Sequence, residues 1–149
     1  MRTLRIQTED FDPGAEIRAL AAGRAEVGAI VAFAGLVRGD DGLSALTLEH
    51  YPGMTQREIA RHIEEAEERW PILGTTVIHR VGRLCPGQRI VLVAVASAHR
   101  RAAFEAAEFL MDYLKTRAPF WKQEHHGTET KWSEARRDDE VAAIRWNPA

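Results

Sequence analysis

An apolar, strand-like run leads directly into a helix whose end is marked by proline, and this succession most constrains the fold. Residues 89–97 are β-branched and apolar, which is typical of a buried strand. Residues 99–117 then repeat apolar side chains at helical spacing, with Ser97 as a possible cap, and Pro119 disfavours helix at Ala118. The predicted buried stripe of this helix comprises Ala103, Phe104, Ala107, Leu110, Met111 and Leu114. The patterns predict a strand followed by a helix that buries one face.

The remaining patterns add further strands and helices. They predict a strand near residues 4–6, a helix from Pro13, strands at 28–35, 45–51 and 75–81, a helix at 55–70 and a turn at 85–88. Residues 45–51 are expected to form a hairpin with 28–35, and residues 55–58 match a capping box. This order predicts an α+β fold with a largely antiparallel sheet packed by helices.

The length of 149 residues favours a single domain that spans residues 1–149. The formal net charge of -2 argues against bulk binding to nucleic acid or to an anionic membrane. No apolar run approaches the roughly 20 residues of a membrane span. Residues 123–149 are polar, but they carry Trp132, Val141, Ile144 and Trp146, so we expect this tail to dock on the domain or on a partner.

Cysteine and histidine usage predicts neither a disulfide nor a metal site. The single cysteine, Cys85, cannot form an internal disulfide, and we interpret it as an incidental turn residue. The amino end lacks the apolar core of a secretory signal, so we expect a reducing, cytoplasmic setting. The histidines lack the spaced ligands of a metal site and are interpreted as packing or surface residues, namely His50, His62, His79, His125 and His126.

Two lysines near the end of the long helix are candidate chemical groups. Lys115 and Lys122 lie on either side of the rigid segment 118–121, so they can converge on one pocket. A lysine beside other cations loses proton affinity and becomes a better nucleophile, whereas a charged one holds phosphate or carboxylate. The pattern alone favours the alternative that both are solvated surface lysines.

Other basic residues stand where anions are commonly bound. His99 and Arg100 open the helix, where backbone N–H groups and the helix dipole favour anions. Arg38 follows the apolar strand 28–35 and can face a cleft. The alternative for His99 and Arg100 is a solvated corner at the start of the helix. The alternative for Arg38 is an exposed loop arginine, paired with Asp40 or Asp41.

Five segments in a fixed order carry a resemblance to a known family. They are residues 28–38, 46–54, 79–82, 97–100 and 113–124, the last of which reads YLKTRAPFWKQE. Together they closely resemble the large, catalytic subunit of molybdopterin synthase over most of the chain. The resemblance implies an α/β-hammerhead type fold and a homodimer of large subunits. Each of these would bind a small ubiquitin-like sulfur-carrier subunit, giving a heterotetramer.

The resemblance also implies a sulfurtransferase of molybdenum cofactor biosynthesis. The carrier would deliver sulfur as a carboxy-terminal Gly-Gly thiocarboxylate, and two sulfurs would enter cyclic pyranopterin monophosphate to form the molybdopterin dithiolene. No metal or cofactor is expected for this step. The residues that fall on substrate-binding positions of the family are Leu36, Val37, Arg38, His99, Arg100, Lys115, Lys122, Gln123 and Glu124.

The resemblance assigns roles to these residues. Arg38 would bind the cyclic phosphate together with His99 and Arg100 of the neighbouring subunit. Lys115 would act most directly, as a proton-transfer group or transient nucleophile, and Lys122 would orient and stabilise charge. Two departures are a short acidic loop at 39–44 and Phe120, where isoleucine is frequent. A non-catalytic adaptor that docks a partner's acidic tail is the alternative class of function.

Overall fold

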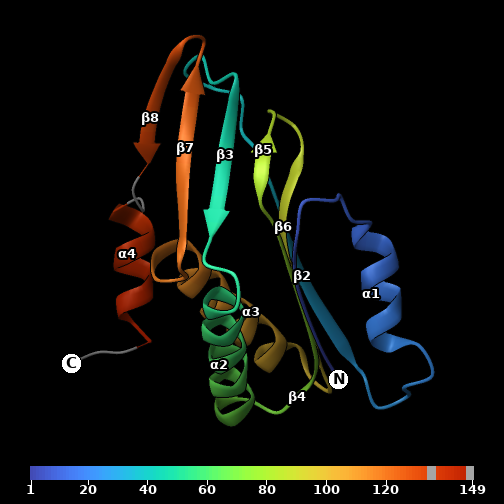
Figure 1. Cartoon of the computed structure of the whole chain (residues 1–149). Helices are drawn as coiled ribbons and strands as arrows, with labels where there is room; N and C mark the ends of the chain where they lie inside the picture. Colours follow the sequence, from blue (N-terminus) through green and yellow to red (C-terminus); the bar gives the residue numbers. More distant parts are fainter. Residues whose placement is uncertain (134–136, 147–149) are drawn as a thin grey trace.

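The computed structural model describes residues 1–133 and 137–146, and Figure 1 shows how its elements are arranged. The strands are β1 (Arg2–Gln7), β2 (Ala29–Leu36), β3 (Ala45–His50), β4 (Ile72–Arg80), β5 (Gly82–Leu84), β6 (Arg89–Ser97), β7 (Phe120–His126) and β8 (Glu129–Ser133). The helices are α1 (Pro13–Ala21), α2 (Met54–Arg69), α3 (Arg100–Thr116) and α4 (Arg137–Ile144). The predicted α+β class with largely antiparallel pairing is confirmed.

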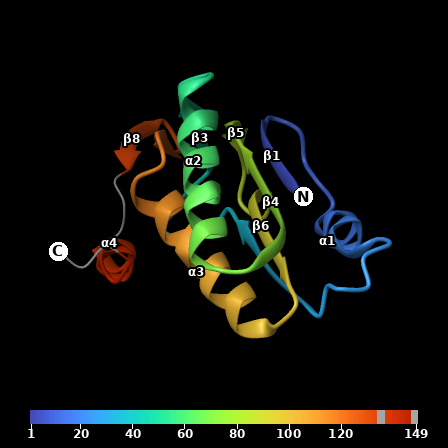
Figure 2. The same ribbon diagram turned by 90° about the horizontal axis from the view of Figure 1, so that it is seen from below.

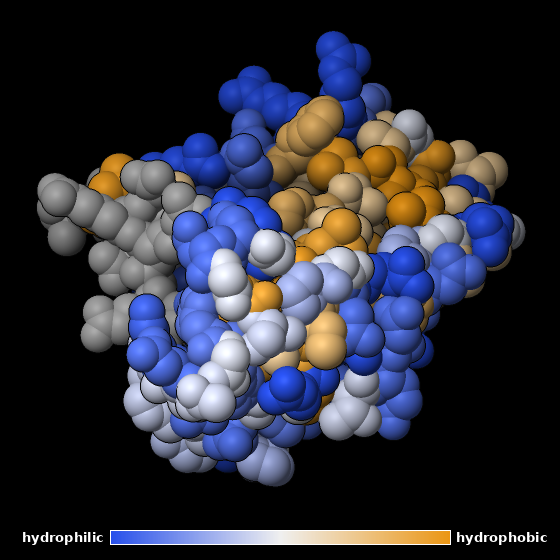
Figure 3. Space-filling model, turned by 90° about the horizontal axis from the view of Figure 1, so that it is seen from above, coloured by the Kyte–Doolittle hydropathy of each residue, from blue (hydrophilic) through white to orange (hydrophobic). Residues whose placement is uncertain are grey.

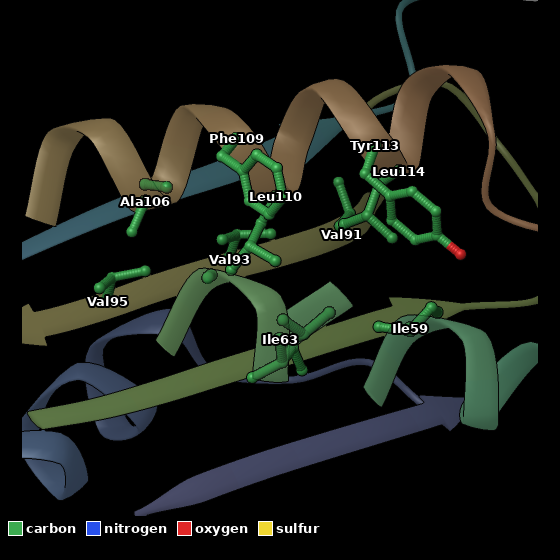
Figure 4. Packing of buried hydrophobic residues seen from close by; sticks show 13 residues of the cluster. Ile59, Ile63, Val91, Val93, Val95, Ala106, Phe109, Leu110, Tyr113 and Leu114 are labelled. Atoms are coloured by element: carbon green, nitrogen blue, oxygen red, sulfur yellow. The ribbon is translucent and has the colours of Figure 1, made fainter. Parts of the chain in front are cut away.

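The first sheet has the order β1-β4-β6-β2, and only the β1–β4 pair is parallel. Helices α2 and α3 lie on one side of it and α1 on the other (Figure 2). Side chains alternate along β6, so Val91, Val93 and Val95 join the cluster with α2 and α3 (Figure 4), whereas Leu92 and Ala94 join clusters on the α1 side. Burial on both faces explains why residues 89–97 are almost continuously apolar.

The second sheet is antiparallel throughout, with the order β5-β3-β7-β8. The predicted hairpin between 28–35 and 45–51 is therefore wrong, because β2 pairs with β6 whereas β3 pairs with β5 and β7. Val37 shows why the chain changes sheets after β2. Its side chain is buried against Leu46, Leu48 and Leu84, and its N–H donates to the Gln88 carbonyl at 2.9 Å. Strands β5, β7 and β8 were not predicted from the sequence.

Helix α3 agrees with the prediction for residues 99–117, with two corrections. Its N-cap is His99 rather than Ser97, whose hydroxyl donates to the Pro71 carbonyl at 2.9 Å. Phe104, predicted to be buried, is 56% exposed, and Phe109 is buried instead at 1%. The buried face is centred on positions 103, 106, 107, 110, 113 and 114, so position 104 lies off the stripe.

Helix α2 begins earlier than its predicted capping box. Gly53 is the N-cap, and its N–H donates to the side chain of Gln56 at 2.8 Å. The box at 55–58 is therefore wrong, because Thr55 lies within the helix. The Thr55 hydroxyl instead accepts from the Tyr51 N–H at 3.0 Å and donates to the Pro119 carbonyl at 3.0 Å. Thr55 thus ties the start of α2 to the turn that precedes β7.

The tail docks through one of its four large apolar residues. Trp146 packs edge-on against Trp70 and Phe109, with ring centroids 5.6 Å apart in both pairs. The other three are more than half exposed, namely Trp132, Val141 and Ile144. Residues 134–136 and 147–149 of this tail lie outside the described residues. Within the described ranges no helix is both long and apolar enough to cross a membrane.

Candidate active site

The two candidate lysines lie on either side of a tightly bonded turn between α3 and β7. Lys115 is in the last turn of α3 and is exposed, and Lys122 is half-buried in β7. The N–H groups of Arg117 and Ala118 both donate to the Tyr113 carbonyl, at 2.9 and 3.1 Å. The Thr55 bond described above also restrains this turn, so the spacing of the two lysines is set by local backbone structure.

Lys122 shares the inner face of the second sheet with Phe120 and Glu124, because side chains alternate along β7. It stands directly opposite Leu48 of β3. Leu48 is only 6% exposed and belongs to the same buried cluster as Val37. Phe120 packs against both this cluster and the main core. The ammonium of Lys122 is therefore carried at the edge of an apolar region, where charge interactions are less screened than in water.

A buried histidine lies between the lysines and the core. His79 is 7% exposed, stacks on Phe120 with ring centroids 4.1 Å apart, and donates from Nδ1 to the Arg80 carbonyl at 2.9 Å. Burial chiefly, together with the charges of Lys115 and His50, lowers the pKa of His79 to about 4. The ring is therefore neutral at physiological pH.

The charge of Lys115 contributes to the lowered pKa of His79, so the lysine acts electrostatically on this ring. Of the two interpretations given for His79, a packing or a surface residue, its burial favours packing. Its interaction with Lys115 was missed, although residues 79–82 belong to one of the five family-like segments and carried a signal.

The loop after β2 has both core and surface residues. Leu36 is 59% exposed, whereas the side chain of Val37 is buried and its backbone bonds to the turn before β6, so Val37 anchors this loop. Arg38 is mostly exposed, and its Nε lies 2.9 Å from a carboxylate oxygen of Asp40, an ion pair that the sequence offered as one alternative. Arg38 follows directly on Val37, whose cluster contains the Leu48 that faces Lys122.

The last two predicted residues of β7 lie on opposite faces. Glu124 is on the face of Lys122 and accepts a hydrogen bond from His126 Nε2 at 3.2 Å. Gln123 is on the other face, where it is opposite Thr47 of β3 and Trp132 of β8. Of this pair, only Glu124 shares the face that carries Lys122.

His99 and Arg100 lie at the far end of α3 from Lys115. Both are exposed, and the His99 side chain makes no capping hydrogen bond. Arg100 and Lys115 are fifteen positions apart in the helix, so their backbones are about 22 Å apart at 1.5 Å per residue. One chain therefore does not bring the His99–Arg100 pair to the lysines.

An apolar, unpaired strand edge lies near the same helix. β2 is the last strand of the first sheet, and Phe33 and Leu36 on it are 42% and 59% exposed. Phe104 of α3 is also exposed. Figure 3 shows that many hydrophobic residues gather in one part of the face seen from above. Contiguous apolar surface beside a free strand edge is typical of a protein interface.

The site has the composition of an anion-binding and proton-transfer centre. Among the described residues, no group of three or more His, Cys, Asp or Glu side chains is placed to hold a metal ion. The charged side chains offered by the candidate site are chiefly cationic. Such groups bind phosphate or carboxylate and stabilise negative charge that develops during a reaction.

Several known proteins are similar to this chain in sequence and structure. A family model described as MoaE protein matches residues 6–117. The molybdopterin synthase catalytic subunit of Mesorhizobium japonicum is 63% identical over 147 residues, covering 97% of this chain and 92% of that protein. The solved structure of a molybdopterin biosynthesis MoaE protein from Burkholderia ambifaria has a TM-score of 0.84 at 49% identity, covering 98% of both chains. A molybdopterin synthase structure from Staphylococcus aureus has a TM-score of 0.78 at 32% identity, covering 86% of this chain and 94% of that one.

Proposed function

This chain belongs to the MoaE family, and we propose that it acts as the catalytic subunit of a molybdopterin synthase. The observation that carries the proposal is the 63% identity, over 97% of the chain, to a relative of that name. Two lysines joined by a short, tightly bonded turn support it, one at the end of α3 and one on β7. On this proposal residues 1–149 act as one domain.

The proposed reaction is sulfur transfer. A thiocarboxylate at the end of a small carrier subunit is the nucleophile, and cyclic pyranopterin monophosphate is the acceptor that becomes the dithiolene of molybdopterin. Both partners are anionic, which matches a site whose charged groups are chiefly cations. The reaction requires no resident metal or cofactor.

Lys115 has the most direct role in this proposal. It is exposed at the end of a rigid helix, and its charge acts on the neutral His79 ring. From there it can transfer a proton or act as a transient nucleophile. Lys122, at the edge of the apolar cluster, holds the thiocarboxylate and stabilises developing charge. Gln123 and Glu124 complete the substrate-binding part of β7.

The phosphate grip is proposed to come from two chains. Arg38 with Leu36 and Val37 belongs to the chain that supplies the lysines, whereas His99 and Arg100 belong to its neighbour. The separation of about 22 Å along α3 supports this division, since one chain cannot supply both groups to one pocket. The exposed apolar residues of β2 support a homodimer.

The proposed assembly also includes a second kind of subunit. The relative's name, catalytic subunit, implies that the enzyme has another subunit. The small ubiquitin-like carrier with its Gly-Gly thiocarboxylate fits the reaction as that subunit. Two copies of each chain give a heterotetramer. We place this assembly in the cytoplasm.

The substitution Lys115→Arg separates this function from an adaptor that only docks an acidic tail. Arginine keeps the charge but not the proton-transfer chemistry, so carrier binding should persist while molybdopterin formation from thiocarboxylated carrier is lost. Carrier affinity by calorimetry and product by fluorescence of the oxidised pterin are the two readouts. Substantial remaining activity would refute the catalytic role of Lys115.

A mixed dimer tests the shared site. An Arg100→Ala chain combined with a Lys115→Ala chain can rebuild one complete pocket, so the mixture should recover some activity that neither variant has alone. Subunit exchange is confirmed by differently tagged chains. Absence of rescue despite exchange contradicts the proposal that His99 and Arg100 come from the neighbour.

A further inference from the structure

A second polar pocket lies between α2 and α3. It has a volume of about 340 Å³, which suits a small ligand. Glu58, Arg61, His62 and Glu65 of α2 and Tyr113 and Arg117 of α3 line it. Tyr113 and Arg117 are four residues apart and share a helix face, whereas Lys115, two residues from each, points about 200° away at 100° per residue. The pocket is therefore separate from the candidate active site.

The hydroxyl of Tyr113 is the feature that points to a ligand. Tyr113 is 3% exposed, and its hydroxyl oxygen is fully buried without a hydrogen-bond partner among the described residues. Figure 4 shows this hydroxyl pointing away from the rest of the labelled cluster. Burial raises the pKa of Tyr113 to about 12, so the hydroxyl stays protonated and can donate. A buried donor without an acceptor is costly, and a ligand acceptor would remove that cost.

Two guanidinium groups stand near Tyr113 as further hydrogen-bond donors. The Arg117 guanidinium lies 5.9 Å from the centre of the Tyr113 ring. Among the charges that act on the hydroxyl, that of Glu58 raises its pKa, and those of Arg61 and Arg117 lower it by smaller amounts. The two carboxylates of the pocket are already paired, Glu58 with Arg61 at 2.8 Å and Glu65 with Arg69 at 2.7 Å. Each guanidinium has five N–H donors, so Arg61 can bind Glu58 and a ligand together.

His62 completes the wall of the pocket without adding charge. Its ring stacks on Tyr113 with centroids 3.3 Å apart, and Nδ1 donates to the Glu58 carbonyl at 2.9 Å. Burial lowers the pKa of His62, and Arg61 and Arg117 contribute to the same shift. The two arginines come from different helices, and both act on the His62 and Tyr113 rings.

We propose that this pocket binds a small oxyanion, a phosphate or carboxylate group, which accepts hydrogen bonds from the Tyr113 hydroxyl and from Arg61 and Arg117. The ligand joins α2 to the end of α3. The end of α3 leads into the turn before β7, so occupancy stiffens the segment that separates Lys115 from Lys122. The site thereby adds a binding function outside the candidate active site that acts on the segment carrying the two lysines.

The first test is calorimetric titration of the full chain with inorganic phosphate and, separately, with acetate, at constant ionic strength. Tyr113→Phe removes only the hydroxyl, and it should weaken binding about tenfold or more, because hydrogen bonds to charged groups are strong. Arg117→Gln should weaken it at least as much. Arg101→Gln is the matched control on the same helix, because Arg101 is exposed and paired with Glu105, and its loss should leave binding unchanged. Binding of both anions indicates a general oxyanion site, and binding of phosphate alone indicates a phosphate site.

Thermal unfolding gives a second readout, which distinguishes a ligand-binding tyrosine from one that only stabilises the fold. In phosphate-free buffer, Tyr113→Phe should unfold at the same temperature as the parent or above it, because the buried hydroxyl lacks a partner. Phosphate should then raise the unfolding temperature of the parent more than that of the variant. A variant that is less stable without phosphate and that binds phosphate as tightly as the parent would overturn the proposal. So would an equal loss of binding in Arg101→Gln.

Discussion

Replacement of His79 by glutamine tests whether the ring on which Lys115 acts is buried in its neutral form. In the folded chain the pKa of His79 is lowered from 6.5 to about 4, chiefly by burial. As the pH falls below about 6.5, the unfolded chain binds a proton that the folded chain refuses until about pH 4. Stability that is present above the unfolded pKa is therefore lost in this window. Glutamine can still donate to the Arg80 carbonyl but does not titrate.

The size of the effect follows from the shift. One pKa unit corresponds to about 1.4 kcal/mol, so His79 accounts for about 2.5 kcal/mol of lost stability by about pH 4.5. Other groups also titrate there, including His62, whose pKa is lowered in the same direction. The prediction therefore concerns the difference between the two proteins. From neutral pH to about pH 4.5, His79→Gln should lose about 2.5 kcal/mol less than the parent.

Urea unfolding followed by tryptophan fluorescence across this pH range measures the free energy of unfolding of both proteins. His99→Gln is the control, because the exposed ring of His99 meets water in the folded and unfolded chain alike. Parallel pH profiles for His79→Gln and the parent would refute the reasoning, since they would mean that the folded and unfolded chains bind protons equally at this ring.

Two further predictions concern close contacts that position the candidate site. Gly28→Ala would place its Cβ 2.2 Å from the Ala98 carbonyl oxygen, so urea unfolding should show a loss of about 2–3 kcal/mol or more. Thr55→Val removes the bond to Pro119 and should cost about 1–3 kcal/mol in the same assay, whereas Thr55→Ser keeps the hydroxyl and should cost less. Because the Thr55 bond restrains the turn before Lys122, Thr55→Val should also lower molybdopterin formation measured below its unfolding transition.

The elements that could be predicted from the sequence are those whose signals are local. Strand β6 was predicted because burial on both faces gives a continuous apolar run, and helix α3 because its apolar residues repeat every 3.6 residues. The hairpin between β2 and β3 was wrong because strand pairing depends on distant partners. β2 pairs with β6, which lies more than fifty residues later in the sequence. Val37, directly after β2, is buried against residues of the second sheet and so directs the chain there. β7 lacks an alternating pattern because all of its residues are half-buried, as its mixture of aromatic and charged side chains permits.

The candidate site divides along the same line. Lys115 and Lys122 were predicted to converge because only six residues, Pro119 among them, separate them, so their spacing is almost a local property. The neighbourhood of His79 and the unpartnered hydroxyl of Tyr113 arise only when helices and sheets pack. A single sequence carries no pattern for a missing hydrogen bond, so the pocket between α2 and α3 could not be predicted.

Helix α3 links these findings because each part of it faces a different neighbour. Its first residue, Arg100, lies about 22 Å from Lys115 in its last turn, and Tyr113 faces the second pocket in between. A helix buried along one side by the main core cannot bend or slide freely, so these separations are fixed. In the proposed homodimer, one α3 therefore supplies Lys115 to its own pocket and Arg100 to its neighbour's. The length of this single helix then sets the geometry of both pockets, and an oxyanion bound at Tyr113 acts on the end that carries the lysine.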